Sequence, residues 1–271
     1  MSHEQSGMNK IGITKPVVVS EFPKSGGSWI VSMLGKALGV ACRDIYMQPG
    51  FDLFDFSQHP WYVGVEVPDF PTQSVIKSHE LPGSLAIPFD VTQVHLVRDG
   101  RDVVVSKYFF ERDFCVKNGI IESFDQSFES FVASESRSWA NYVSSWLEQP
   151  GVLTIRYESF LADPAGELGA LVKALTGATL DEDVLLGVVG QFTRERFSAS
   201  LASTFKHNTF VRKGVRGDWV NHFNEMDELA FEAGAGHALR RLGYETDTSW
   251  LRTADEPVSL PASQVHDVVV A

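Results

Sequence analysis

Apolar residues recur along the chain with two different periods. Short β-branched runs predict buried strands, and longer segments with an apolar residue at every third or fourth position predict amphipathic helices. Strands are expected at 17–22, 74–79, 93–97 and 152–157, and helices at 29–38, 103–110, 128–147, 164–175, 181–192 and 226–242, the last interrupted by two glycines. Because strands and helices alternate over long connections, the pattern predicts an α/β fold with a central, mainly parallel β-sheet flanked by helices.

The chain is expected to form a single domain over residues 16–250. Its 271 residues fit one large domain better than two small ones, and a hydrophobic content of 44% is normal for a full core. Residues 1–15 are expected to be a flexible polar leader, and 251–271 a weakly ordered tail. The polar start argues against a secretion signal, and no apolar run is long enough to span a membrane. Two cysteines make no disulfide framework, so a reducing, cytoplasmic location is expected.

The charge of the chain changes this picture. A net charge of −12 argues against nucleic acid or an anionic membrane as the main partner. An acidic chain can hold a polyanion only where its cations gather. Three such clusters lie beside expected strand ends or glycine turns: Lys24, the pair Arg98 and Arg101, and the group Arg212, Lys213 and Arg216. One basic pair alone would be read as solvated surface, but three in such places indicate an anion site.

The segment 17–38 is typical of a nucleotide-binding strand, loop and helix. Its β-branched run ends at Phe22, a loop rich in glycine and serine follows, and the helix begins near Trp29. Glycines let backbone N–H groups converge on an anion, and a helix N-terminus adds positive potential there. The loop is not a Walker A sequence, because its lysine, Lys24, precedes the glycines. Taken alone, a glycine-rich turn is equally compatible with a plain strand-to-helix connection.

His79 stands at the carboxyl end of an expected strand, where open parallel sheets keep their ligands. A lone histidine is more often structural, and His95, inside the strand 93–97, illustrates that case. The position of His79 at the strand end favours a functional interpretation.

Three segments resemble the signatures of the cytosolic-type sulfotransferase family, which uses 3′-phosphoadenosine 5′-phosphosulfate (PAPS). Residues 22–29, Phe-Pro-Lys-Ser-Gly-Gly-Ser-Trp, are similar to its 5′-phosphosulfate loop. Residues 94–106 are similar to its 3′-phosphate segment, in which a serine follows an arginine by eight residues. Residues 210–219 contain the third signature, Arg-Lys-Gly-x-x-Gly-Asp-Trp. Lys-Ser-His at 77–79 lies between the first and second signatures, and Tyr157 lies between the second and third, as in the family. The resemblance therefore spans nearly the whole chain. It implies a three-layer, P-loop-like fold.

The resemblance implies transfer of the sulfuryl group of PAPS to a hydroxyl or amine of a small molecule, with 3′,5′-adenosine bisphosphate as the product. His79 would be the general base, Lys24 would stabilise the leaving phosphate oxygen, and Lys77 is a second candidate for stabilising the transferring group. The residues implied in cofactor binding are Lys24, Ser25, Gly26, Gly27 and Ser28 at the 5′-phosphate, Trp29, Tyr157 and Phe197 at the adenine, and Arg98, Ser106, Arg212, Lys213 and Gly214 at the 3′-phosphate. No metal is expected, because no His, Cys and Asp residues show ligand spacing.

The chain also departs from the family pattern. Gly27 and Ser28 stand where many members have two threonines, and the short dimerisation motif of the animal enzymes is absent, so a dimer of that kind is doubtful. Asp99 at a strand end imitates the acid of a magnesium-dependent kinase. A Mg/ATP-dependent small-molecule kinase therefore stays an alternative, beside a catalytically silent nucleotide-binding protein. The aromatic stretch 46–62 is either a surface loop or a lid, and it suggests an acceptor with apolar or aromatic surface.

Overall fold

The computed structural model describes residues 12–45, 73–84, 90–202, 207 and 210–252. Within them the strands are β1 (Val17–Glu21), β2 (Ala41–Asp44), β3 (Ser74–Ser78), β4 (Thr92–Val97) and β5 (Leu153–Arg156), in the sheet order β2-β3-β1-β4-β5. All four pairings are parallel. The predicted α/β fold with a parallel central sheet is therefore confirmed. Because β1 lies between β3 and β4, its carboxyl end is the point where such sheets bind ligands.

Among the described residues, one helix follows β1, three lie between β4 and β5, and the remaining helices follow β5. These helices are α1 (Gly27–Leu38), α2 (Gly100–Phe109), the π-helix η2 (Phe110–Cys115), α3 (Phe128–Leu147), α4 (Tyr157–Ala162), α5 (Pro164–Thr176), α6 (Glu182–Val189), α7 (Arg194–Ala202), the 3-10 helix η3 (Asp218–Asn221) and α8 (Glu225–Leu242). A π-helical turn inside a helix is often found at a functional site. Here η2 continues α2 directly toward the loop that carries Phe210.

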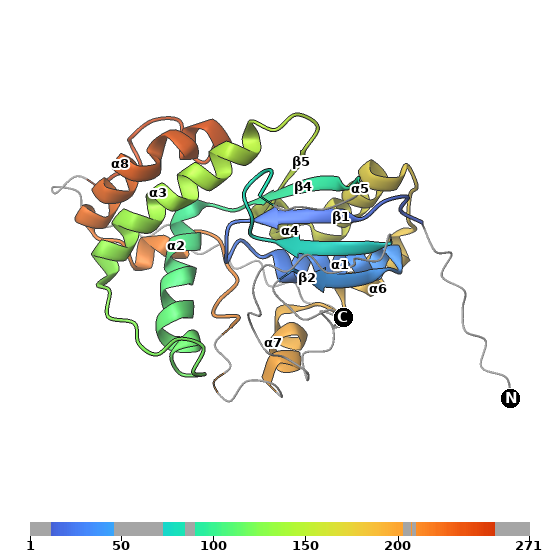
Figure 1. Cartoon of the computed structure of the whole chain (residues 1–271), viewed down its shortest axis with the longest axis horizontal. Helices are drawn as coiled ribbons and strands as arrows, with labels where there is room; N and C mark the ends of the chain where they lie inside the picture. The colour runs from blue at the N-terminus through green and yellow to red at the C-terminus, as the bar shows by residue number, and fades with distance from the viewer. Residues whose placement is uncertain (1–11, 46–72, 85–89, 203–206, 208–209, 253–271) are drawn as a thin grey trace, which may run out of the picture.

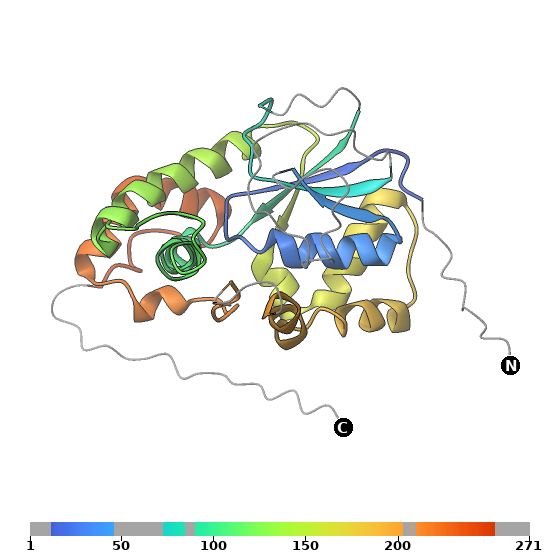
Figure 2. The ribbon, with the colours of Figure 1, turned by 60° about the horizontal axis from the view of Figure 1, so that its bottom comes forward.

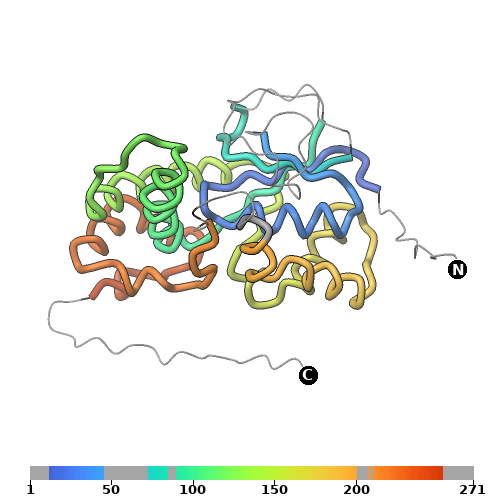
Figure 3. The backbone as a smooth tube through the Cα atoms, turned by 90° about the horizontal axis from the view of Figure 1, so that it is seen from below, coloured from blue at the N-terminus to red at the C-terminus, as the bar shows by residue number. Residues whose placement is uncertain are grey.

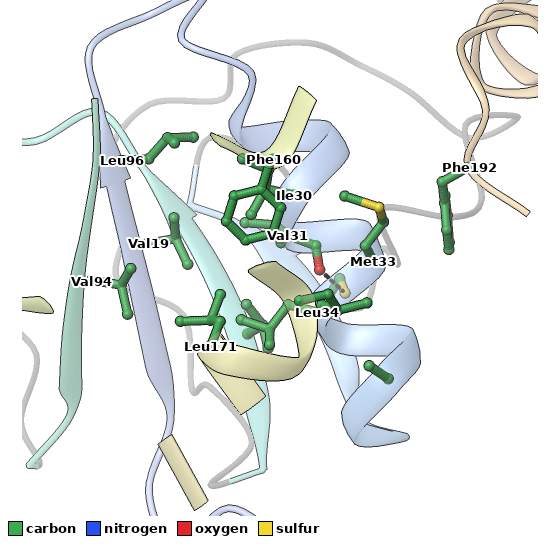
Figure 4. Packing of buried hydrophobic residues seen from close by; sticks show 14 of the residues in the cluster. Val19, Ile30, Val31, Met33, Leu34, Val94, Leu96, Phe160, Leu171 and Phe192 are labelled. Atoms are coloured by element: carbon green, nitrogen blue, oxygen red, sulfur yellow. Dashed lines mark hydrogen bonds between the residues drawn. The ribbon is translucent and has the colours of Figure 1, made fainter. Parts of the chain in front are cut away.

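One face of the sheet is covered by α1 and α4–α6 (Figures 1 and 2). Figure 4 shows Val19 and Leu96 of the sheet on the side of Ile30, with Phe160 of α4 beside them. Ile30 is fully buried, and burying such a side chain stabilises a fold by roughly 1.5–3 kcal/mol. Ile13, which precedes the first strand, is only 5% exposed and belongs to the same core.

A second group of helices, α2, α3 and α8, lies beyond the carboxyl ends of the strands (Figures 1 and 3). Its core is aromatic, with the rings of Trp139 and Phe231 6.0 Å apart. The expected interruption of α8 is wrong, because the helix runs unbroken through both of its glycines. A Cβ at Gly234 would overlap Ser136 of α3, so this glycine permits close helix packing instead of ending the helix.

His95 has the structural role that its place inside a strand predicted. It is fully buried in β4, and its ring stacks on Trp146 of α3 at 5.8 Å. The ring of Tyr142, one turn earlier in α3, lies 6.1 Å from it. These two residues of α3 cover the second face of the sheet at this point.

The helices and strands also differ from the sequence pattern at other points. The pattern missed β2, α4 and α7. Tyr157 does not end a strand but begins α4, after Arg156 in an extended conformation. The polar residues Arg43 and Asp44 hide the apolar pattern that a strand would show. The segment forms β2 because it pairs with β3. The aromatic stretch 46–62, the start of the leader and the tail from 253 lie outside the described residues.

Candidate functional site

Residues 22–29, the segment predicted to hold the 5′-phosphate and called the phosphate loop below, run from the end of β1 into the start of α1. Lys24 is the residue other than glycine that has a positive φ, 76°, in the described part of the chain. Gly26 has φ 104°, and a Cβ there would come 2.5 Å from the ring of Tyr157. Residues held in such conformations are concentrated at functional sites. The loop thus takes a shape that a glycine at position 26 makes available, with the N-terminus of α1 directed at it.

One backbone donor of this loop is already used inside the protein. The N–H of Gly27 donates to Glu21 Oε2 at 2.6 Å, and Glu21 is only 2% exposed. Burial raises the pKa of Glu21 to about 7, while Lys77 and the hydrogen bond from Gly27 oppose the rise. The sequence pattern gave no reason to single out Glu21, because it was read as the last residue but one of a strand.

His79 is held with a defined tautomer at the end of β3. Its Nδ1 lies 2.9 Å from the carbonyl oxygen of Glu21, and a carbonyl can only accept, so Nδ1 carries the proton. The lone pair of Nε2 therefore faces Lys77 Nζ at 3.1 Å. Burial and the nearby Lys77 lower the pKa of His79 to about 3. The imidazole is neutral at physiological pH and can accept a proton at Nε2.

Lys77 connects His79 to two buried carboxylates. Its Nζ is 3.0 Å from Asp44 Oδ2 and 3.9 Å from Glu21 Oε1, with the lysine side chain 6% exposed. Asp44 comes from β2, the strand that the sequence pattern missed. A buried cation needs partners of this kind to stay charged. The structure thus places the predicted pair Lys77 and His79 side by side and adds Asp44.

Lys24 ends between two aromatic rings. Its Nζ lies 4.0 Å from the centroid of Phe110 and 4.1 Å from that of Phe210, within the range of cation–π contacts. It also donates to the carbonyl oxygen of Phe210 at 3.4 Å. Burial, followed by repulsion from Lys77, lowers the pKa of Lys24 to about 7. The aromatic pair, which the sequence did not indicate, fixes where this cation sits.

Arg98 joins the phosphate loop to the third signature. Its guanidinium donates to the carbonyl oxygens of Lys24 and Val215, each at 3.1 Å, and lies over the ring of Tyr157 at 4.5 Å. Arg101, which the sequence grouped with Arg98, points elsewhere. It pairs with Asp99 and Glu245.

Two aspartates organise residues 210–219. Asp218 accepts from Arg212 and from Lys213, both at 2.6 Å. Although burial opposes the effect, these hydrogen bonds hold the pKa of Asp218 well below its usual range. Asp102 of α2 accepts from the backbone N–H groups of Gly217 at 2.6 Å and Trp219 at 3.0 Å, and burial raises its pKa to about 6. Neither aspartate was singled out from the sequence, since their partners are seen only in the folded chain.

Aromatic side chains border the same space. Trp29 and Tyr157 make an edge contact at 6.0 Å, and Trp29 Nε1 donates to the carbonyl oxygen of Phe192 at 2.8 Å. The hydroxyl of Tyr157 donates to the carbonyl oxygen of Gly214 at 3.2 Å. Phe197, on the unpredicted helix α7, is 7% exposed and packs in the main core.

Most of these groups line one cavity of about 400 Å³. The predicted site residues that line it are Lys24, Gly26, Gly27, Ser28, Trp29, Lys77, His79, Arg98, Ser106, Tyr157, Phe197, Arg212, Lys213 and Gly214. Ser25 does not line the cavity, and its Oγ is buried. In the described residues, Ser25 Oγ, Arg98 Nε and Arg212 Nε have no hydrogen-bond partner. Unused buried donors beside several cations fit a ligand that carries phosphate groups.

Among the residues that the structure describes, no three His, Cys, Asp or Glu residues are placed so that they could hold a metal ion. Over the same residues, no helix is both long and apolar enough to cross a membrane.

Comparisons with known proteins give the family of this site. Residues 14–243 match the sulfotransferase domain family. Mouse (Mus musculus) sulfotransferase 1B1 is 26% identical over 243 residues, 80% of each chain. Dog (Canis lupus familiaris) sulfotransferase 1A1 is 28% identical over 250 residues, 84% of each chain.

Two solved structures share the fold. Mouse sulfotransferase SULT7A1 complexed with PAP has a TM-score of 0.66 at 20% identity, covering 85% of this chain and 87% of that one. Retinol dehydratase in complex with androsterone and inactive cofactor PAP has a TM-score of 0.59 at 21% identity, covering 83% of this chain and 80% of that one.

Proposed function

Because the chain belongs to the sulfotransferase family, as its three signatures predicted, we propose that it moves the sulfuryl group of PAPS to a hydroxyl or amine of a small apolar acceptor. Membership of this family identifies the chain as a PAPS-dependent sulfotransferase.

The observation that carries the proposal is the convergence of the predicted residues on one cavity. Arg98 and Ser106 come from the segment 94–106 and Arg212, Lys213 and Gly214 from the segment 210–219, and all five line this cavity. We assign them to the 3′-phosphate, the group that distinguishes PAPS from ATP. The unused donors Arg98 Nε and Arg212 Nε support this assignment, since charged donors bind phosphate through short, strong hydrogen bonds. The loop residues Lys24 to Ser28 would hold the 5′-phosphate, with Trp29, Tyr157 and Phe197 beside the adenine.

The chemistry assigned to His79 follows from its tautomer. The acceptor hydroxyl gives its proton to Nε2, while its oxygen forms a bond to sulfur and the bond from sulfur to the phosphate oxygen breaks. The neutral imidazole accepts this proton, and the carbonyl of Glu21 holds the ring in place. A positioned base is worth ~10²–10⁴-fold in rate. Lys77 and Lys24, which line the same cavity, would stabilise the transferring group and the leaving phosphate oxygen.

The acceptor is proposed to be a small alcohol, phenol or amine with apolar surface. The aromatic rings of Phe110 and Phe210 lie at the cavity beside Lys24, where an apolar molecule could rest. Retinol dehydratase, which shares the fold, has been solved with androsterone and with retinol. A cytoplasmic location, the absence of an animal-type dimer and the domain limits 16–250 stay predictions.

A thermal shift experiment tests the cofactor assignment. Full-length protein is heated with 3′,5′-adenosine bisphosphate without metal, and separately with ATP and magnesium. At about a hundred times its dissociation constant, a ligand of the folded state stabilises it by roughly 2.7 kcal/mol. Stabilisation by the bisphosphate supports the assignment. Stabilisation by ATP and magnesium alone would point to the kinase instead.

The role of His79 is tested with the variant His79→Ala. Transfer from PAPS to a panel of phenols and alcohols is expected to fall by ~10²–10⁴-fold, with bisphosphate affinity retained. Turnover within a few-fold of the wild type would show that His79 is not the base.

A further inference from the structure

Glu21 is a buried acid at the centre of the site to which the mechanism above gives no part. Its carboxylate accepts the N–H of Gly27 at 2.6 Å, and that N–H is one of the loop donors assigned to the 5′-phosphate. Glu21 also lines the cavity. An anion of the protein therefore occupies a donor that the cofactor needs.

The presence of Glu21 explains the glycine at position 27. A Cβ added at Gly27 would overlap the carboxylate of Glu21. A threonine, the residue that many members of the family carry at this place, would require the Glu21 side chain to move away from its present position. Glu21 and Gly27 thus fit one another as a pair, and the unusual loop sequence is tied to the buried carboxylate.

Burial makes the ionised form of Glu21 costly, and the two cations near it offset this cost only in part. Lys77 of β3 faces it at 3.9 Å but is nearer to Asp44 of β2, so two buried carboxylates share that lysine. Lys24 of the loop is the other cation that acts on it. The Gly27 N–H at the start of α1 is its hydrogen-bond donor. Adding a phosphate at the same donor would place a further negative charge against Glu21, and neighbouring like charges favour the protonated acid.

We propose that Glu21 occupies the anion position of the phosphate loop and takes up one proton from solvent when the 5′-phosphate of the nucleotide binds. This inference rests on the proposed function, because it needs the bisphosphate in this cavity. The carboxylate gains a proton and no other bond is made or broken. The neutral acid releases the Gly27 N–H to the phosphate, and its own O–H can donate to a phosphate oxygen. Glu21 thereby changes from a competitor of the cofactor into one of its ligands. Because the pKa of Glu21 is raised to about 7, its carboxylate can take up this proton near neutral pH.

Calorimetric titration with 3′,5′-adenosine bisphosphate tests the proposal. The heat of binding is measured at about pH 8 in buffers of different ionisation enthalpy, which gives the number of protons taken up. Phosphate monoesters lose their second proton near pH 6, so they contribute little there. Wild type is expected to take up about one proton more than Glu21→Gln. Its affinity should also fall by up to about tenfold more per pH unit above neutrality than that of the variant.

Lys24 is the group that could imitate this signal, because its pKa is also about 7. Removing the charge of Glu21 makes protonated Lys24 less favourable, so uptake through Lys24 alone would be equal or larger in Glu21→Gln. Equal or larger uptake in the variant overturns the proposal. Asp44→Asn is the matched control, since it removes the other buried carboxylate at Lys77 without touching Gly27. It should keep the extra proton.

An infrared difference spectrum of the wild type provides a second measurement that does not depend on the folding of Glu21→Gln. Bisphosphate binding should produce the C=O band of a protonated carboxyl group, and this band should persist in Asp44→Asn. Binding without such a band overturns the inference but leaves the proposed function intact. A chain that binds no bisphosphate at any pH would instead refute the proposed function itself.

Discussion

Replacing Gly26 by alanine tests whether the shape of the phosphate loop depends on Tyr157. Gly26 has φ 104°, and the added methyl carbon would come 2.5 Å from the ring of Tyr157. The backbone cost of such a conformation for alanine is about 1–2 kcal/mol. The methyl group would also displace the ring, which makes a hydrogen bond to Gly214 and an edge contact with Trp29 and lies under Arg98.

The lost contacts set the size of the effect. A hydrogen bond contributes about 1 kcal/mol, an aromatic pair roughly 0.5–1.5 and a cation–π contact roughly 0.5–1. Gly26→Ala should therefore lower the free energy of unfolding by roughly 3–5.5 kcal/mol. Gly119→Ala is the matched control, since Gly119 has φ 70° with no atom within 4 Å of an added Cβ. It should cost only about 1–2 kcal/mol.

Urea unfolding measures the free energies, and titration with 3′,5′-adenosine bisphosphate measures the site. Gly26→Ala should also weaken bisphosphate binding, while Gly119→Ala should not. In a Tyr157→Ala background the extra cost at Gly26 should largely disappear, because the clash has gone. Equal destabilisation by the two alanine substitutions, or full additivity with Tyr157→Ala, would refute the argument.

Four further predictions follow from charged groups of the site. Lys77→Met leaves buried carboxylates without their cation and should cost about 3–5 kcal/mol in urea unfolding, whereas a loss near zero would mean that the ion pair does not stabilise the fold. Arg98→Ala should weaken bisphosphate binding in calorimetry by several-fold or more, and unchanged affinity would remove it from the site. The folded state depresses the pKa of Asp218, so this carboxylate stabilises the fold above about pH 4. In urea unfolding, Asp218→Asn should be less stable than the wild type above that pH, and the difference should shrink as the pH falls below it. A difference that stays constant with pH would contradict this. Asp102 has a folded pKa raised to about 6, so the wild type should lose stability as pH rises from about 4 to about 6, and Asp102→Asn should lack that loss in urea unfolding across this range.

The fold was predictable where neighbouring residues carry the signal. The buried run 17–21 and the helix 27–38 show their periods within a few residues, and the long helix 128–147 shows its apolar face over five turns. By contrast, β2 is short and half polar, and it becomes a strand because β3 lies beside it. The helix α7 has little amphipathic character, so periodicity could not reveal it.

The candidate site shows the same division. Spacing within a segment identified Lys24, His79, Arg98 and Lys213 as candidates, and the structure brings all four to one cavity. Spacing could not identify Asp102, because its hydrogen-bond partners lie more than a hundred residues further along the chain.

The sequence by itself therefore determined the type of fold, the family and most of the residues that line the cavity, because these depend on patterns only a few residues long. Tertiary structure alone decided which nitrogen of His79 holds the proton, where the ammonium of Lys24 lies and which carboxylate occupies the phosphate loop. Each of these depends on burial and on atoms from distant segments. Charge, protonation and hydrogen bonding respond to surroundings in space, and the folded chain creates those surroundings.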